Sequence, residues 1–270
     1  MRLSLKRRDL YFLIDTLIPT SANKEKTADK LQNDLVLVEA MLDDDRLFRR
    51  LMADEAILVH VSPWLFFTVL LRRARHDMKQ EAFTIERRDR QKVVLFDTDQ
   101  VVELLEREPV RDYLAAMLAS FTRVGSVTVP VRVRKGIWRR YRTSDLDVDG
   151  LMRYSQNLDG EFQYEPYRRI GDVCLFLSSM FPDHIDARYR YPVSGQVRPR
   201  SRSRLVRSRD DYEAHGQAFY RMASEHERAR LDSLDEVLAT LSKDFILAEK
   251  PLAFLANRYL GFARQRLFDI

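Results

Sequence analysis

The strongest candidate for metal chemistry in the sequence is the acidic segment DLDVDGLMRYSQ. Asp145, Asp147 and Asp149 stand at positions 1, 3 and 5 of this segment and Gly150 at position 6, as in the front half of an EF-hand calcium loop. That loop requires a bidentate Glu at position 12, where this chain has the neutral Gln156. Aspartates at the start of a helix also cap its free N–H groups and favour the positive end of its dipole. We therefore predict a helix start here and no metal site.

Three consecutive aspartates, Asp43, Asp44 and Asp45, suggest magnesium, because adjacent carboxylates can share a hard cation. Arginines follow at once, and no second acidic motif of matching form occurs in the chain. We expect a solvated helix start with ion pairs between residues four apart.

Histidine and cysteine are too sparse for a zinc site. No two of the five His have HxxxH spacing, and the one Cys also excludes an internal disulfide. His60 lies in the apolar run 56–71, so we expect a hydrogen-bonded core histidine. Cys174 lies on an apolar helix face and is expected to be inert packing. The chain has no GxSxG, Walker or Rossmann fingerprint, and we expect no cofactor.

Twice in the chain an Arg is followed by a His with four to six residues between them. Arg209 precedes His215 in this way, and Arg221 precedes His226. The spacing resembles the active motif of HEPN-type ribonucleases, which are helical proteins. The resemblance implies that His acts as acid or base while Arg holds the scissile phosphate. Because 37 of the 270 residues are Arg, chance alone yields about two such pairs, and we keep the ribonuclease as an alternative.

Basic residues gather in two segments that contain no acid. The first is SVTVPVRVRKGIWRRYR, residues 126–142, and its candidate binding residues are Arg132, Arg134, Lys135, Trp138, Arg139, Arg140, Tyr141 and Arg142. The second lies in an exposed loop over 190–209, and its candidates are Arg198, Arg200, Arg202, Arg204, Arg207 and Arg209. The cations within such a segment repel one another unless a polyanion or an acidic partner screens them. The two aromatic residues of the first segment could stack on bases.

The composition favours a helical globular protein. Apolar residues make up 45% and charged residues 32%, and the 8 Gly and 9 Pro are too few for an all-β design. The net charge is +5, although the many Arg also fit a genome that favours Arg codons. A single Cys fits a reducing compartment, so we expect a cytoplasmic protein. The apolar run 56–71 is shorter than the roughly 20 residues of a membrane span, so we expect no membrane contact.

Hydrophobic periodicity predicts a mainly α fold with two helical regions. Residues 1–125 form the first region, with helices at 5–18 and 27–42, another that starts at Ser62–Pro63, and a small β-hairpin made by FTIERR and KVVLF. Residues 126–142 form a short basic β-like arm, where Pro130 indicates an edge strand. Residues 143–270 form a C-terminal helical bundle that contains the Arg-rich loop.

These features indicate a non-enzymatic binding or regulatory protein that contacts nucleic acid or another acidic surface through its Arg-rich segments. The HEPN-like helical ribonuclease is one alternative. A structural or scaffold subunit, whose Arg-rich loop docks on a neighbouring protein, is another.

Overall fold

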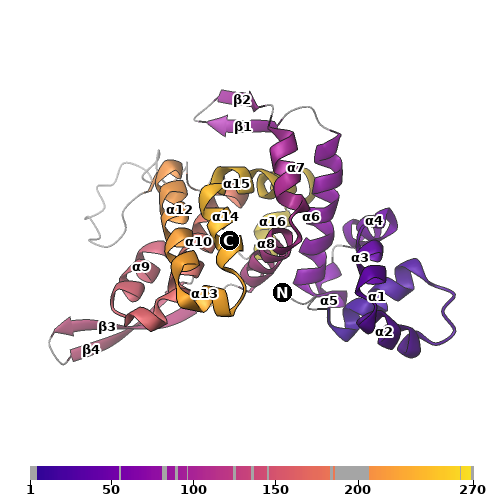
Figure 1. Ribbon diagram of the computed structural model, residues 1–270, viewed down its shortest axis with the longest axis horizontal. Helices are drawn as coiled ribbons and strands as arrows, with labels where there is room; N and C mark the ends of the chain where they lie inside the picture. The colour runs from indigo at the N-terminus through magenta and orange to yellow at the C-terminus, as the bar shows by residue number, and fades with distance from the viewer. Residues whose placement is uncertain are drawn as a thin grey trace. The chain divides into compact units, whose positions relative to one another are not determined.

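Helices dominate the computed structural model (Figure 1), which confirms the predicted mainly α class. The residues that the structure describes are 5–54, 56–80, 84–88, 91–95, 97–123, 126–134, 137–144, 146–182, 185, 207–261 and 263–268. For the four strands the description is limited to the backbone. Within these ranges, none of the helices combines the length and the apolar character needed to cross a membrane.

The chain divides into two units. The first unit joins Met1–Thr122 to Phe254–Ile270, and the second is Arg123–Ala253. Residues 254–270, which we predicted to be part of the C-terminal bundle, lie in the first unit of this division. The segment belongs to the first unit because its aromatic side chains pack there, with the ring centroids of Phe67 and Phe268 5.7 Å apart.

The first unit contains most of the short helices. They are α1 (Arg7–Leu17), α2 (Lys24–Asn33), α3 (Leu35–Leu42), α4 (Asp45–Ala53), α5 (Ile57–His60), α6 (Pro63–Lys79), α7 (Thr98–Glu106), α8 (Glu108–Phe121), the π-helical η2 (Leu255–Leu260) and α16 (Ala263–Phe268). Strands β1 (Thr84–Arg88) and β2 (Gln91–Leu95) pair antiparallel, with Ile85 opposite Val94.

Helix α6 is the centre of the first unit's core. Its start is confirmed as predicted, since Ser62 accepts a hydrogen bond from Leu65 N (3.1 Å) and Pro63 occupies the first turn. Leu65, Phe67 and the other apolar residues of its inner face are buried. The apolar run that contains this helix start is therefore a buried core segment, as expected.

The helix predicted at 27–42 is two helices. Asp34 ends α2 and begins α3, and its carboxylate accepts a hydrogen bond from Leu37 N (3.0 Å). Aspartate competes with the helical backbone for such hydrogen bonds, which makes it a good cap and a poor interior residue. The hydrophobic stripe runs across this break, so periodicity alone did not reveal it.

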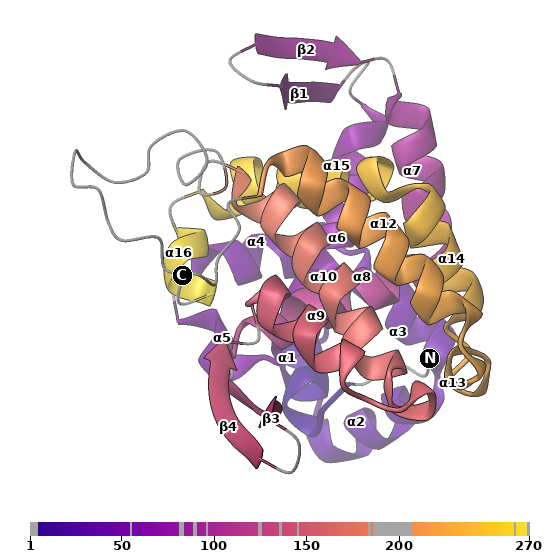
Figure 2. The same cartoon turned by 90° about the vertical axis from the view of Figure 1, so that its left-hand side faces the viewer.

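The second unit contains β3 (Ser126–Arg134), β4 (Ile137–Ser144), α9 (Val148–Gln156), the 3₁₀ turn η1 (Gly160–Phe162), α10 (Tyr164–Met180), α12 (Arg209–Glu225), α13 (Glu227–Leu231), α14 (Asp235–Lys243) and α15 (Phe245–Phe254). Helices α10, α12 and α14 lie side by side (Figures 1 and 2). Two glycines allow the close approach, because Gly171 faces the ring of Tyr220 and Gly216 faces that of Phe245.

Candidate functional sites

The acidic segment begins a helix, as predicted. Asp147 is the N-cap residue of α9 and accepts a hydrogen bond from Gly150 N (3.2 Å). Asp149 pairs with Arg207 at 2.5 Å, so its charge is neutralised within the protein. Asp145 lies outside the described residues. In the part of the chain that the structure describes, no cluster of three or more His, Cys, Asp or Glu could hold a metal ion.

The aspartate run also begins a helix. Asp44 caps α4 by accepting a hydrogen bond from Arg46 N (2.8 Å), which confirms the predicted helix start. The neighbouring aspartates reach α6 instead of pairing four residues ahead. Asp43 binds Arg72 at 3.0 Å, and Asp45 binds Arg73. These carboxylates tie α4 and the end of α3 to α6.

Two arginines that were expected to contact a partner are held inside the second unit. The side chain of Arg207 is 9% exposed and pairs with Asp149. Arg209 pairs with Glu213 (3.0 Å) and with Glu249 (2.8 Å), whose side chain is 2% exposed. Each guanidinium therefore already serves an internal carboxylate. The other arginines of the loop, Arg198, Arg200, Arg202 and Arg204, lie outside the described residues.

The basic arm is an antiparallel hairpin, β3–β4. In its register Thr128 faces Arg142, Pro130 faces Arg140 and Arg132 faces Trp138, with a shift between Arg132 and Arg134. Paired positions of such a ladder lie on one face, and successive positions alternate between faces. The positions of one face include Arg132, Trp138, Arg140 and Arg142. The positions of the other include Val129, Val131, Arg139 and Tyr141. Lys135 lies outside the described residues.

The structure does not assemble either Arg–His pair into a reactive site. Arg209 and His215 are six residues apart on α12, which separates their directions by about 120° at 100° per residue. The Nδ1 atom of His215 contacts the carbonyl oxygen of Asp211.

The ring of His226 is used at both nitrogens. Its Nδ1 accepts a hydrogen bond from Arg228 N (3.1 Å) and caps α13, while Nε2 lies 2.9 Å from the carbonyl oxygen of Gly160 and donates to it. A histidine held in this way has no ring nitrogen left for a substrate.

Cys174 is fully buried on α10, as expected for packing. Burial raises the pKa of its thiol well above the ordinary value. The thiolate, which is the reactive form, is therefore disfavoured.

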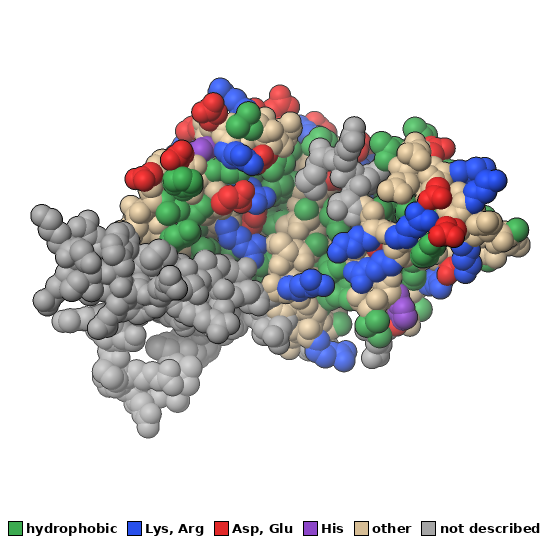
Figure 3. Space-filling view, turned by 90° about the horizontal axis from the view of Figure 1, so that it is seen from below, with side chains coloured by type: hydrophobic (Ala, Val, Ile, Leu, Met, Phe, Trp, Pro, Cys, Tyr) green, Lys and Arg blue, Asp and Glu red, His purple; other side chains and the backbone are tan. Residues whose placement is uncertain are grey.

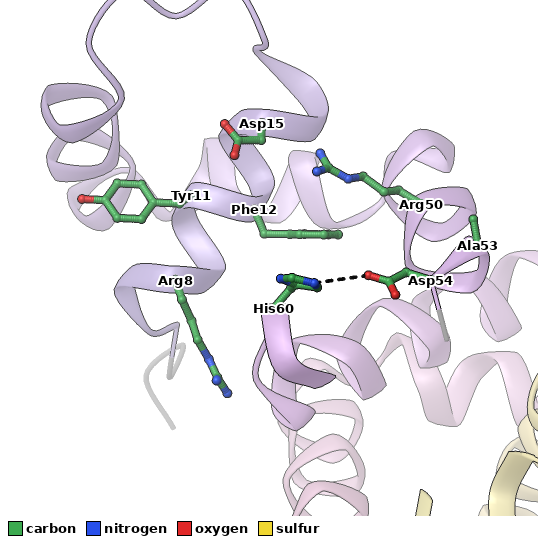
Figure 4. Close-up of a pocket in the computed structure, with 8 residues that line it drawn as sticks. All are labelled: Arg8, Tyr11, Phe12, Asp15, Arg50, Ala53, Asp54 and His60. Carbon is green, nitrogen blue, oxygen red and sulfur yellow. Dashed lines mark ion pairs between the residues drawn. The ribbon is translucent and has the colours of Figure 1, made fainter. Parts of the chain in front are cut away.

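A pocket in the first unit was missed by the sequence analysis. Its lining residues come from α1, α4 and α5 and the turn between the last two, and they are Arg8, Tyr11, Phe12, Asp15, Arg50, Ala53, Asp54 and His60 (Figure 4). Arg50 lies over the ring of Phe12, with its guanidinium carbon 4.7 Å from the ring centroid.

The interpretation of His60 as a core histidine is wrong, because its side chain is 60% exposed and faces Asp54. His60 occupies the end of the short helix α5, which turns it away from the core that the apolar run suggested.

A second group of charges in the first unit is buried. Arg72 on α6 and Arg111 on α8 are 3% and 4% exposed, and both face Glu39, with Arg111 at 3.9 Å. Asp112 lies beside them, 3% exposed, with a shielded Oδ1 that accepts no hydrogen bond. Burial raises the pKa of Asp112 to about 6. The cluster holds α3, α6 and α8 together. Within it, burial disfavours the charged form of the Asp112 carboxyl.

The fold and these sites define a mainly helical protein with a basic hairpin and a pocket lined by aromatic residues and by charges of both signs. Comparisons of the chain with protein-family models, with curated proteins and with solved structures found no significant match.

Proposed function

We propose that the protein is a non-enzymatic nucleic-acid-binding protein that contacts its ligand through one face of the β3–β4 hairpin. The register of the hairpin carries the proposal, since it assigns Arg132, Arg140 and Arg142 to positions on the same face. Arg140 and Arg142 are two residues apart on β4 and Arg132 lies on the neighbouring strand, and such spaced cations match the spaced negative charges of a phosphate backbone.

The same face includes the position of Trp138, which pairs with Arg132 in the ladder. A tryptophan among arginines suits a single strand, because an exposed base can stack on the indole while the cations contact phosphates. The opposite face has valines at positions 129 and 131 and two cations, Arg139 and, beyond the shift in register, Arg134, against three on the first face. The loop arginines at 198, 200, 202 and 204 lie outside the described residues and stay candidate contacts on their sequence alone.

The histidines support a binding role over the ribonuclease. In the described structure Arg209 is paired with two glutamates, and both ring nitrogens of His226 are occupied. A general acid or base must have a ring nitrogen within reach of the substrate.

Fluorescence anisotropy over a salt series tests the proposal, with a labelled single-stranded RNA and a labelled DNA duplex as probes. We expect the affinity to fall steeply with salt. Each lost phosphate contact should reduce the slope of log K against log salt by about 0.9 on the duplex or about 0.7 on the single strand. The combined variant R132Q/R140Q/R142Q should therefore show a much shallower slope than the wild type.

The matched pair Arg139→Gln and Arg140→Gln makes the test specific. Both remove one charge from adjacent residues of β4, but the register assigns them to opposite faces. We expect Arg140→Gln to weaken binding several-fold more than Arg139→Gln. Equal effects of the two variants, or no binding by the wild type at low salt, would overturn the proposal. Probe cleavage that His215→Ala abolishes would support the ribonuclease instead.

A further inference from the structure

Strand β2 has a free edge in the described structure. Its sheet consists of β1 and β2, so one side of each strand pairs with its neighbour and the other side pairs with no described strand. In Figures 1 and 2, β1 is the strand nearer to α6 and α7, and β2 is the outer one. A free edge presents a row of unpaired N–H and C=O groups on which another strand can pair.

The sequence of β2 does not block this edge. Natural proteins protect free edges with charged side chains or with Pro, which has no N–H donor. Strand β3 contains Pro130, β4 contains three arginines, and β1 has a charged residue at three of its five positions. In β2, by contrast, residues 93–95 are Val, Val and Leu, and the one charge, Lys92, lies next to the turn.

The helical surface differs from this edge in its charge. In the view of Figure 3, Lys and Arg side chains lie among Asp, Glu and apolar side chains over the described helices. Interspersed charges of both signs limit the self-association of such a surface. The uncharged residues 93–95 of β2 have no such protection.

We infer that β2 pairs antiparallel with β2 of a second copy of this chain, so that the two hairpins form one sheet in the order β1–β2–β2–β1. Such pairing is two-fold symmetric, and two-fold dimers are the commonest protein oligomers. With the symmetry axis at Val94, this residue stands opposite Val94 of the second copy, and Val93 stands opposite Leu95. Because Ile85 pairs with Val94 in the hairpin, the central row of the sheet reads Ile, Val, Val, Ile. Pairs of β-branched residues stabilise neighbouring strands.

The same register keeps like charges apart, which favours a second copy as the partner. Each Lys92 is two positions from the axis, so the two lysines lie four positions apart along the sheet, or about 14 Å at the rise of an antiparallel strand. A hairpin of two strands is only marginally stable by itself, and the dimer supplies the additional strands. The inference is independent of the proposed function, because β2 and the β3–β4 hairpin belong to different units.

Sedimentation velocity of the full chain over a concentration series tests the inference. We expect the wild type to form a dimer as its concentration rises. Val94→Lys should raise the dissociation constant of the dimer by about 10-fold or more, because it puts like charges opposite each other at the axis. Ile85→Lys is the matched control, since it adds the same charge to the same pair of the hairpin, but on β1 and away from the axis. It should retain most of the dimerisation.

A mixing experiment separates a lost interface from a misfolded hairpin. Val94→Glu alone should also be mostly monomeric. An equimolar mixture of Val94→Lys and Val94→Glu should recover the dimer, because opposite charges then stand across the axis. Circular dichroism of each variant verifies that the helices are retained.

A cross-link locates the axis on the strand. Directly opposite residues of neighbouring strands have Cβ atoms about 4.5–5.5 Å apart, which is close to the spacing of a disulfide. The natural Cys174 is buried, so Val94→Cys introduces a thiol without competition from it. Mild oxidation should yield a covalent dimer of Val94→Cys and far less of Ile85→Cys. A wild type that stays monomeric at every concentration would overturn the inference. So would a dimer that Val94→Lys leaves unchanged, equal loss in Val94→Lys and Ile85→Lys, or a mixture that stays monomeric.

Discussion

Gly216 on α12 lies so close to Phe245 on α15 that a Cβ atom at Gly216 would come within 2.2 Å of the phenyl ring. The same Cβ would lie 3.1 Å from Cβ of Cys174 on α10. One missing side chain therefore sets the distance among three helices of the second unit.

Replacement of this glycine should destabilise the second unit. Gly216→Ala improves helix propensity by about 1 kcal/mol, but it forces ring and backbone shifts in a packed core that typically cost about 1–3 kcal/mol. At a separation of only 2.2 Å we expect the packing cost to exceed the propensity gain, with a net loss of about 1–2 kcal/mol. Urea denaturation followed by circular dichroism measures it. Gly160→Ala is the control, since nothing lies within 4 Å of its added Cβ, and a Gly216→Ala protein as stable as wild type would contradict the packing.

Asp112 should make the stability of the protein depend on pH. Burial raises the pKa of Asp112 to about 6 in the folded protein, while an unfolded aspartate releases its proton near a pKa of about 3.9. The folded state therefore holds more protons than the unfolded state between these values. The free energy of unfolding should fall as the pH rises from about 4 to about 7, by up to about 3 kcal/mol from this group.

Asp112→Asn removes this titration. Its free energy of unfolding relative to the wild type should increase from pH 4 to pH 8 by an amount of that order, about 2–3 kcal/mol. Asp44→Asn is the control, because hydrogen bonds from Arg46 lower the pKa of Asp44. Its effect on stability should be constant above about pH 4 and should shrink only below that pH. Wild-type stability from Asp44 is present at neutral pH and is lost as the pH falls through that lowered pKa. Parallel pH profiles for Asp112→Asn and the wild type would refute the prediction for Asp112.

The sequence predicts the helices of this fold better than it predicts their breaks. Apolar residues at helical spacing identified α1 and α6, and the Ser62–Pro63 signal located the start of α6 correctly. Asp34 was missed as a break because the apolar stripe continues through it. The return of 254–270 to the first unit rests on long-range aromatic contacts, which periodicity does not encode.

Charge partners were the least predictable feature. Arg207 and Arg209 look like the rest of the Arg-rich loop in sequence, and only the fold brings Asp149 and Glu249 to them. The pocket was missed for a similar reason. Arg8, Arg50 and His60 are far apart in sequence and match no motif, and His60 sits in a run whose average hydrophobicity suggested burial.

The C-terminal segment should stabilise the first unit through one hydrogen bond that can be removed cleanly. Tyr259 donates to the Oδ2 atom of Asp77 on α6 (2.8 Å), and its ring packs edge-on against Phe48. Tyr259→Phe keeps the ring contact and removes the hydroxyl, so we expect a loss of about 1.5 kcal/mol, the lower end for a hydrogen bond to a charged group. Thermal and urea unfolding measure the change.

Arg209, at the end of the Arg-rich loop, should contribute to stability and not to RNA binding, whereas Arg140 of the hairpin should contribute to RNA binding and not to stability. Removal of Arg209 takes an ion pair from Glu249, whose side chain is 2% exposed, and breaking a buried pair costs about 3 kcal/mol or more. Arg209→Gln should therefore lower the free energy of unfolding strongly, while it leaves the affinity for the RNA probe and its salt slope unchanged below the unfolding transition. Arg140→Gln should do the reverse, with weaker RNA binding at nearly unchanged stability. Urea denaturation and anisotropy on the same two proteins decide the matter, and a reduced salt slope in Arg209→Gln would return this residue to the binding surface.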